Sequence, residues 1–580
     1  MTAGQSNNLE AQLIDAVSAD ELMDSTRAIA QWVRLSGTEE EAKAFDWIEA
    51  KLKGFGLTTH RYAHPGLVSW PESASLELLT DGGAQSIPCA THAFAASTPA
   101  GGLEGELVAV GRATAENLAK ANIQGKIALI DGIIAPNTNL LVEEAGAAAA
   151  IWIAGGRLHE RGLDPIWGTP TPETSHLLPK TPSVSVKAGE GEQIKAALAK
   201  GPVRVRLQTD VYQDWRTLPL LTADLTPSGN TPEADLFVMF SGHVDSWYYG
   251  AMDNGTANAT QLEVARLMSE RKDDLYRGLR MAFWSGHSHG RYASSAWYAD
   301  TFWHDLHERC AVHVNIDSVG AKNAVVLSEA PVMAETYAFA RDVLKDTVDV
   351  DLDYRRMSRS SDQSFWGHGI SSVLASLSEQ GIEDSEMFKA MASLLGGGAK
   401  GGGLGWWWHT TEDTLDKIDD DNLVRDAGIY AETLWRLCTV DRLPLDMAAL
   451  ADEIGDAIDG YIGAANGTLD LSGTKELAST LAARIRDTDL TKAPAARANQ
   501  LLLDLGRQLV PVNFTANGPF EQDLALGTQP VPGLREVAQL ATLDPASDDF
   551  RFLKTKLIRQ RNRIEHALRA SLRLVAEFNG

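Results

Sequence analysis

The sequence predicts an α/β fold. A mixed, mostly parallel sheet forms the core, a β-rich domain is inserted into it, and a helical domain follows at the C-terminus. Residues 236–240 form the continuous apolar run of a strand buried on both faces, and a helical pattern follows them. Short β-like runs separated by Gly, Pro and Thr fill residues 66–217. Segments rich in Ala, Leu and Arg with a 3.6-residue period occupy residues 443–580.

The individual elements follow from periodicity and turn residues. Residues 9–57 have helical spacing with turn signals at Ser36-Gly37 and Gly54, and residues 57–62 are extended. In the inserted stretch, residues 107–110, 127–130 and 149–153 predict strands. Residues 279–284 predict a second core strand, with a helix from Gly290 onward. Pro and Gly predict breaks in the C-terminal helices at residues 511–519 and 527–533.

Length, charge and cysteine content restrict the class of protein. Because 580 residues exceed one hydrophobic core, we expect domains at residues 1–65 with 218–442, at 66–217 and at 443–580. The formal net charge of −26 argues against nucleic acid and membrane surfaces as partners. Three isolated cysteines indicate neither a disulfide framework nor a thiolate metal site. With no signal-like N-terminus and no spanning apolar run, we expect a cytoplasmic protein.

A His-x-Asp triplet follows the first core strand. His243 and Asp245 come directly after it, where open α/β sheets place their chemistry. Asp253 opens the next helical segment, so its carboxylate can face His243. Imidazole and carboxylate suit zinc, and Asp245 can hold one ring N–H of His243 so that the other nitrogen binds metal. A capped loop followed by an ordinary helix N-cap explains the same spacing.

Several motifs in order resemble one family. G-H-V-D-S-W-Y-Y-G-A-M-D-N-G (242–255), V-N-I-D-S-V-G (314–320) and W-W-W-H-T-T-E-D-T (406–414) are similar to motifs of the co-catalytic zinc metallopeptidases of the M28 type, the glutamate carboxypeptidase and zinc aminopeptidase superfamily. The resemblance implies that His243 binds one zinc ion, Asp253 bridges two, and Asp317 and His409 complete the set. Residues 66–217 resemble a protease-associated domain, and residues 443–580 resemble the dimerisation domain of the glutamate carboxypeptidase branch. A homodimer is therefore expected.

The chain departs from that family at S-G-H-S-H-G, residues 285–290. There the family carries two adjacent glutamates, a general base and a metal ligand. An ungapped match places His287 at the base position and Ser288 at the ligand position, with His289 next. Because a neutral hydroxyl is a poor zinc ligand, we expect either one firmly held ion or a two-metal site in which a histidine replaces the glutamate. Either His287 or His289 supplies this further ligand or the general base; iron, manganese and cobalt are the alternative metals.

The remaining site residues are assigned by their position near these motifs. Trp247, Tyr248 and Trp408 adjoin two ligand positions and would form an aromatic wall for the substrate. Asp362 lies in a segment that resembles the family's substrate pocket, and Arg359 precedes it, so both are candidate substrate contacts. Asp413 and Ser288 are expected to support the ligands without touching the metal.

The sequence therefore predicts a metal-dependent hydrolase that cleaves an amide or peptide C–N bond of a small or aromatic substrate with metal-activated water. One alternative is a non-catalytic binding protein on a degenerate peptidase scaffold, as the transferrin receptor is. Another is a different metal-dependent reaction on the same scaffold. The four surviving ligand positions favour an enzyme, and the missing glutamate pair favours the binding protein.

Overall fold

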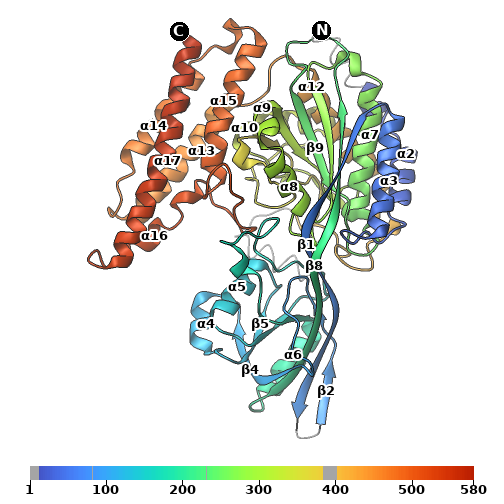
Figure 1. The fold of residues 1–580 in the computed structure, drawn as a ribbon, viewed down its shortest axis with the longest axis vertical. Coiled ribbons are helices and arrows are strands. Elements are labelled where there is room, and N and C mark those ends of the chain that lie inside the picture. The colour runs from blue at the N-terminus through green and yellow to red at the C-terminus, as the bar shows by residue number, and fades with distance from the viewer. Residues whose placement is uncertain (1–11, 81–82, 230, 383–400) are drawn as a thin grey trace.

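The computed structural model of the chain describes residues 12–80, 83–229, 231–382 and 401–580. Figure 1 shows three parts: a sheet with helices on both faces, a smaller lobe below it and a bundle of long helices beside it. Residues 66–217, which include the lower lobe, are called the insert below.

The sheet that carries the site is mostly parallel. Strand β9 (Phe237–His243) lies between β10 (Gly278–Trp284) and β11 (Cys310–Asn315), and β13 (Ser371–Val373) extends the parallel set. Strand β8 (Arg204–Leu225) is antiparallel to β10. The strands that were predicted at residues 236–240 and 279–284 are thus neighbours, and their carboxyl ends meet at one edge.

Alternate side chains of β9 are buried on opposite faces of the sheet, as the two-residue period of a strand requires. Val238 and Phe240 belong to the largest buried cluster, together with residues of helices α2, α3, α7 and α12. Phe237 and Met239 belong to a second cluster with Tyr298 of α8. Helices therefore cover both faces, which explains the continuous apolar sequence of the strand. The helices of this part are α2 (Ala19–Ile29), α3 (Glu39–Gly54), α7 (Ala257–Ser269), α8 (Ala293–Thr301), α9 (Trp303–Arg309), α10 (Ala334–Val348) and α12 (Asp420–Thr439).

A long two-stranded ribbon joins the sheet to the insert. Strand β1 (Thr58–Thr80) pairs antiparallel with β8 along almost its whole length, and both strands run from the upper part into the lower lobe (Figure 1). The domain boundaries that were expected near residues 65 and 217 therefore lie inside continuous strands. The remaining elements of the insert are β2 (Gly83–Ile87), β3 (Ala90–Thr91), β4 (Leu103–Gly111), β5 (Ile127–Asp131), β6 (Ala149–Ile153), β7 (Ser183–Val186), α4 (Ala115–Ala121), α5 (Pro136–Glu144) and α6 (Ala188–Leu198). A small separate pair, β12 (Ala324–Val326) and β14 (Glu379–Gln380), flanks the core.

The C-terminal region is helical, as its periodicity predicts. It contains α13 (Met447–Ala465), α14 (Ser472–Arg486), α15 (Ala495–Phe514), α16 (Val537–Leu540) and α17 (Asp548–Asn579). The break expected at residue 511 begins later, because Pro511 lies in the last turn of α15, where a missing N–H removes only one intrahelical bond. Gly369 (φ +73°) lets α15 approach the sheet closely, since a Cβ there would stand 2.3 Å from Arg507 Cα.

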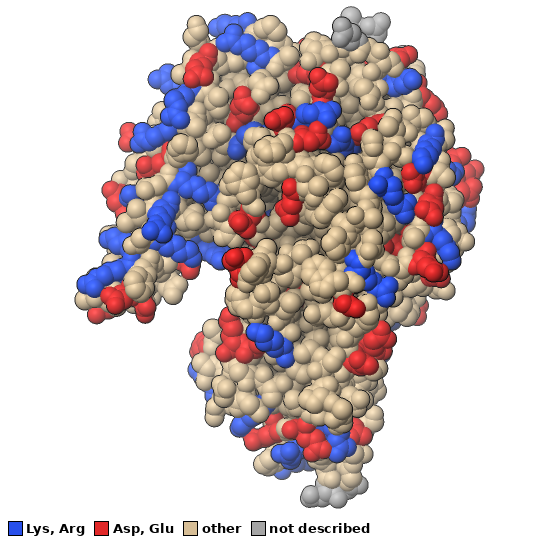
Figure 2. Space-filling view, viewed as in Figure 1, with Lys and Arg blue, Asp and Glu red and all other residues tan. Residues whose placement is uncertain are grey.

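No described helix is long and apolar enough to cross a bilayer. Acidic and basic side chains are spread over the face in Figure 2, and Lys and Arg gather over the helical bundle. Helix α17 carries several basic residues, among them Lys556, which pairs with Glu536, and Arg551, which pairs with Asp548.

Candidate active site

The candidate metal ligands come from ends of neighbouring strands and the loops beside them. His243 is the last residue of β9, and Asp317 lies two residues beyond β11. The loop of residues 285–292 follows β10. Asp253 lies in a π-helical turn, Ala251–Thr256, immediately before α7. The parallel arrangement brings these residues to one edge of the sheet, as expected for an α/β fold.

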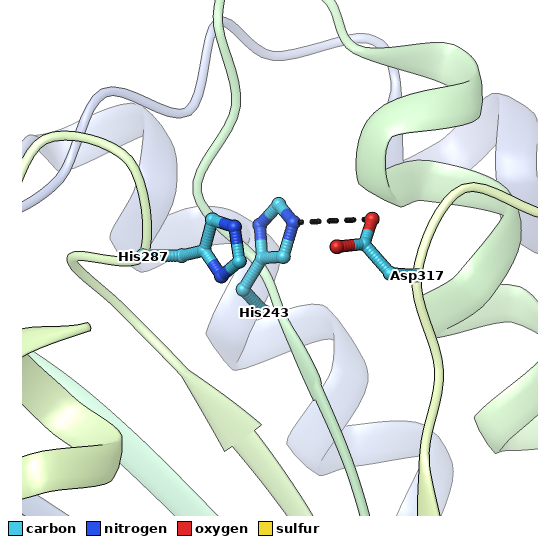
Figure 3. A group of neighbouring side chains, drawn as sticks. All are labelled: His243, His287 and Asp317. Carbon is cyan, nitrogen blue, oxygen red and sulfur yellow. Dashed lines mark ion pairs between the residues drawn. The ribbon is translucent and has the colours of Figure 1, made fainter. Parts of the chain in front are cut away.

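Two histidines approach the two oxygens of one buried carboxylate. His243 Nε2 lies 3.1 Å from Asp253 Oδ1. It also lies 3.7 Å from Asp317 Oδ1, the pair joined by a dashed line in Figure 3. His409 Nε2 lies 3.0 Å from Asp253 Oδ2. The Nδ1 atom of each ring contacts a backbone carbonyl at 2.8 Å, that of Asp245 for His243 and that of Glu160 for His409. A carbonyl can only accept, so Nδ1 carries the proton and Nε2 faces Asp253.

This arrangement fits a divalent metal. His243 Nε2 and Asp253 Oδ1 are both buried and have no aligned hydrogen-bond partner. Burial alone would raise the pKa of Asp253, but the neighbouring His243 and His409 hold it well below its usual range. Converging imidazole nitrogens and ionised carboxylates are the ligand set that zinc prefers. Residues His243, Asp253, Asp317 and His409 could therefore hold a divalent ion.

Buried polar groups fix the loop between His243 and Asp253. The carboxylate of Asp413 accepts the backbone N–H groups of Met252 at 2.9 Å and Asp253 at 3.0 Å, and burial raises its pKa to about 7. Arg34, fully buried, donates to the carbonyls of Val244, Tyr249 and Gly250. Asp413 thus has the supporting position expected of it. Nothing in the local sequence pattern distinguished Arg34 as a loop anchor.

The structure gives Asp245 a different contact from the expected one. Its carboxylate is 3.8 Å from His243 Nδ1, whereas its own backbone carbonyl makes the 2.8 Å contact. The carboxylate instead accepts the backbone N–H groups of His287 at 3.1 Å and Ser288 at 3.2 Å. Because the backbone carbonyl of Asp245 already accepts the ring N–H of His243, the Asp245 carboxylate is available to hold the loop after β10.

His287 and His289 occupy different environments. The His287 ring stacks on His243 with 3.9 Å between centroids, and one of its nitrogens forms a group with His243 and Asp317 in which the ligand atoms lie within 4.8 Å of one another. His289 is completely buried: its Nδ1 lies 3.0 Å from Ser36 Oγ and 3.3 Å from Asp245 Oδ2. Figure 3 shows His287 beside His243, with Asp317 on the other side of the His243 ring. The geometry therefore brings His287, and not His289, into the described group of potential ligands.

The candidate substrate contacts divide into two groups. Trp408 stacks on His409 at 3.6 Å, Trp247 lies 5.9 Å from the same ring, and Tyr248 donates to Glu160 at 2.7 Å. Trp408 and Trp247 thus lie beside the His409 ring, and Tyr248 contacts the insert. Arg359 instead donates to Asp523 O and Gln522, and Asp362 Oδ2 lies 2.6 Å from His287 Nδ1. Both side chains therefore have protein partners, in place of the open position that substrate contact requires.

The insert also contacts the site directly, through residues 159–161. His159 Nδ1 donates to Trp408 O at 2.6 Å, and Glu160 N donates to His409 O at 3.1 Å. The guanidinium of Arg161 lies 4.7 Å above the Trp408 ring. This irregular segment has no periodicity and no metal-ligand spacing, so no sequence signal pointed to it.

The fold and the site together define an α/β protein with a candidate metal site at one edge of its sheet. Residues 222–434 match the family model "Peptidase family M28". That part of the chain is thus an M28-type peptidase domain, which confirms the resemblance to this peptidase family and the mostly parallel α/β fold expected from the sequence. The protease-associated domain stays a prediction.

Individual relatives agree with this assignment. The chain is 24% identical over 362 residues to a probable glutamate carboxypeptidase of Zea mays, which covers 50% of this chain and 49% of that protein. It is 26% identical over 117 residues to an aminopeptidase of Rattus norvegicus, covering 19% of this chain and 16% of that protein. The chain thus spans about half the length of the maize relative.

Solved structures share the fold. An aminopeptidase from Aneurinibacillus sp. strain AM-1 superposes with a TM-score of 0.56 at 21% identity, covering 74% of this chain and 96% of that one. A peptidase M28 precursor from Shewanella amazonensis SB2B gives 0.58 at 19% identity, covering 76% and 98%.

Proposed function

We propose that the chain is a metal-dependent hydrolase that cleaves an amide or peptide C–N bond. The observation that carries this proposal is the approach of His243 and His409 to opposite oxygens of Asp253. Two of the approaching atoms, His243 Nε2 and Asp253 Oδ1, are buried and have no hydrogen-bond partner. His243, Asp253, Asp317 and His409 would hold one or two zinc ions. A divalent ion there supplies Lewis-acid polarisation and favours the deprotonated form of water.

His287 is the residue that we propose for proton transfer. Its Nδ1 contacts Asp362, and no described residue bonds its Nε2. An imidazole in this tautomer can accept the proton of the attacking water at Nε2 and then deliver it to the leaving nitrogen. Such acid-base catalysis contributes roughly 10²- to 10⁴-fold, so a histidine can replace the family's glutamate base.

His289 and Asp245 have positioning roles in this proposal. Asp245 receives two backbone N–H groups of the loop that carries His287, and His289 Nδ1 and Ser36 Oγ approach the same carboxylate. This buried network holds the His287 backbone in place. Ser288 contributes its backbone N–H to the network, and its neutral side chain supplies no ligand.

The substrate would bind between the aromatic side chains and the insert. Trp247, Tyr248 and Trp408 offer apolar faces beside His409, which favours a small or aromatic group. Arg161 Nε is buried without a partner, whereas Arg291 Nε donates to the backbone carbonyl of Asp164 at 2.8 Å. Among the described residues no carboxylate pairs with either guanidinium, which favours a substrate that carries a carboxylate.

A binding protein on the same scaffold is the second candidate, because Ser288 occupies the position where the family has a ligand. We also propose that the insert is a protease-associated domain and that residues 443–580 form a dimer interface in a cytoplasmic protein. These proposals rest on resemblance and composition.

Elemental analysis tests the central proposal. Protein purified without added metal is compared with the His243→Ala and Asp253→Ala variants, and His304→Ala, an exposed histidine, serves as control. The parent and control should retain metal, and both site variants should lose it; unchanged metal content in the site variants would refute the proposal. The same samples are tested on aminoacyl 4-nitroanilides and N-acyl dipeptides. Bound metal without any hydrolysis would favour the binding protein.

A further inference from the structure

A continuous chain of hydrogen bonds links His287 to the insert. His287 Nδ1 lies 2.6 Å from Asp362 Oδ2, and Ser295 Oγ donates to Asp362 Oδ1 at 2.6 Å. Ser295 Oγ lies 2.9 Å from Ser364 Oγ, which accepts the indole N–H of Trp167 at 2.8 Å. Asp362, Ser295, Ser364 and Trp167 are all buried. Trp167 belongs to the insert, almost 200 residues away from Asp362 in sequence.

The donors in this chain all point toward Asp362. An ionised carboxylate only accepts, and Asp362 Oδ1 at 2.6 Å is nearer to Ser295 Oγ than its other acceptor, Tyr292 O at 3.2 Å, so Ser295 directs its single proton to Oδ1. Ser364 must then donate to Ser295, and the Trp167 N–H completes Ser364. Each bond polarises the next one in the same sense, which strengthens the whole chain. Ser295 therefore holds Oδ1 of the Asp362 carboxylate, and Oδ2 accepts the N–H of His287.

Ring packing connects the same residues by a second route. Trp167 stacks on Tyr292 at 3.8 Å, and Tyr292 meets His287 edge-on at 4.8 Å. The guanidinium of Arg359 covers Trp167 at 4.2 Å, and Gly168 N donates to Arg291 O at 2.6 Å. The position of the Trp167 indole is therefore set on several sides.

We infer that Asp362 is a positioning residue that selects the Nδ1–H tautomer of His287, and that Trp167 of the insert supports it through Ser364 and Ser295. The insert thus takes part in proton transfer, beyond any influence on substrate access. This inference rests on the proposed function of His287 as the general base. A carboxylate that orients an imidazole in this way leaves Nε2 free to take the proton.

Steady-state kinetics of the zinc-loaded 580-residue protein provide the first test. Asp362→Ala should lower kcat about 10- to 100-fold, the usual effect of losing such a partner. Trp167→Phe keeps an aromatic ring on Tyr292 but removes the indole N–H. Ser364→Ala interrupts the series of hydrogen bonds at its middle. Each variant should lower kcat about 10-fold with little change in KM. Trp303→Phe is the matched control, because the indole N–H of Trp303 donates to Pro519 O at 3.1 Å and takes no part in this series of hydrogen bonds.

The ring tautomer of His287 provides a readout that does not need activity. Nitrogen NMR of ring-labelled histidine, assigned with a His287→Gln variant, should show Nδ1–H in the parent and in Trp303→Phe. Asp362→Ala should shift the ring toward Nε2–H. An unchanged tautomer in Asp362→Ala, or equal kcat in Trp167→Phe and Trp303→Phe, would overturn the inference. A loss of zinc that parallels the loss of kcat would also overturn it, since Asp362 would then support a ligand. If the parent hydrolyses no amide, the proposed function fails and the tautomer measurement still decides this inference.

Discussion

The ring of His409 donates its Nδ1–H to the backbone carbonyl of Glu160 over 2.8 Å. Glu160 belongs to the insert, and His409 belongs to the loop before α12. Because the carbonyl fixes the tautomer, it also fixes the direction of Nε2 toward Asp253. The insert therefore orients a candidate metal ligand as well as the residues around His287. Disturbing the insert should alter chemistry at the site in addition to substrate access.

His287→Ala should lower mainly the activity, whereas His289→Ala should lower mainly the stability. The His287 side chain is partly exposed, so its loss should lower kcat at least about 10²-fold with little change in the free energy of unfolding. His289 is fully buried on Asp245, and its loss leaves a cavity and removes one partner of the buried Asp245 carboxylate, which should cost about 2–4 kcal/mol. Steady-state kinetics and urea unfolding measure the two effects. The reverse pattern would show that His289 is the base.

Arg34→Met should destabilise the chain and weaken metal binding together. The Arg34 guanidinium satisfies carbonyls of the loop between His243 and Asp253, and hydrogen bonds from a charged donor contribute about 1.5–3 kcal/mol each. Arg34→Lys should recover only part of this loss, because an ammonium cannot form the same planar fork. Thermal unfolding and zinc titration measure both properties. An Arg34→Lys chain that equals the parent in both would show that charge alone matters.

The strand ends could be predicted from the sequence because their signal is local. The run from Leu236 is apolar throughout, and a strand buried between helices on both faces produces that pattern. Since parallel strands end at one edge, the positions of His243 and Asp317 near each other followed from topology and resemblance. The structure brings these residues together with Asp253 and His409.

The choice between His287 and His289 could not be made from the sequence. One residue of loop register separates them, and a buried carboxylate from another strand end decides it: Asp245 takes the N–H groups of His287 and Ser288. The contacts that the insert makes with the site could not be predicted from the sequence either. Glu160 and Trp167 lie in an irregular segment, and they reach the site only through docking of parts that are distant in sequence.

Glu335 should make stability depend on pH. It is completely buried with Oε2 unpartnered, and burial raises its pKa from 4.5 to about 7. A raised carboxyl pKa means that the folded chain binds the proton more tightly. Its contribution is therefore fully present below pH 4.5 and is lost as the pH rises through 7, by up to about 1.36 kcal/mol per pH unit.

Glu335→Gln should remove this dependence while keeping an acceptor for Ser371, which donates to Glu335 at 2.8 Å. Denaturant unfolding between pH 4.5 and 8 should show a flatter profile in the variant than in the parent. Glu116→Gln, at an exposed position on α4, is the control and should follow the parent. Parallel profiles for Glu335→Gln and the parent would mean that the carboxyl is ionised in the folded chain.

Arg161→Met should reduce the preference for substrates that carry a carboxylate. Arg161 lies over Trp408, which stacks on His409, and its guanidinium has no carboxylate partner among the described residues. A charge-assisted hydrogen bond to substrate is worth about 1.5–3 kcal/mol, so kcat/KM for an N-acyl dipeptide should fall roughly 10- to 150-fold. The corresponding C-terminal amide should be cleaved almost as well as before. Arg157→Met is the matched control, because Arg157 covers Trp406 at 3.8 Å and is exposed. Equal losses on acid and amide substrates would show that Arg161 acts on the packing of Trp408 and leaves substrate charge unrecognised.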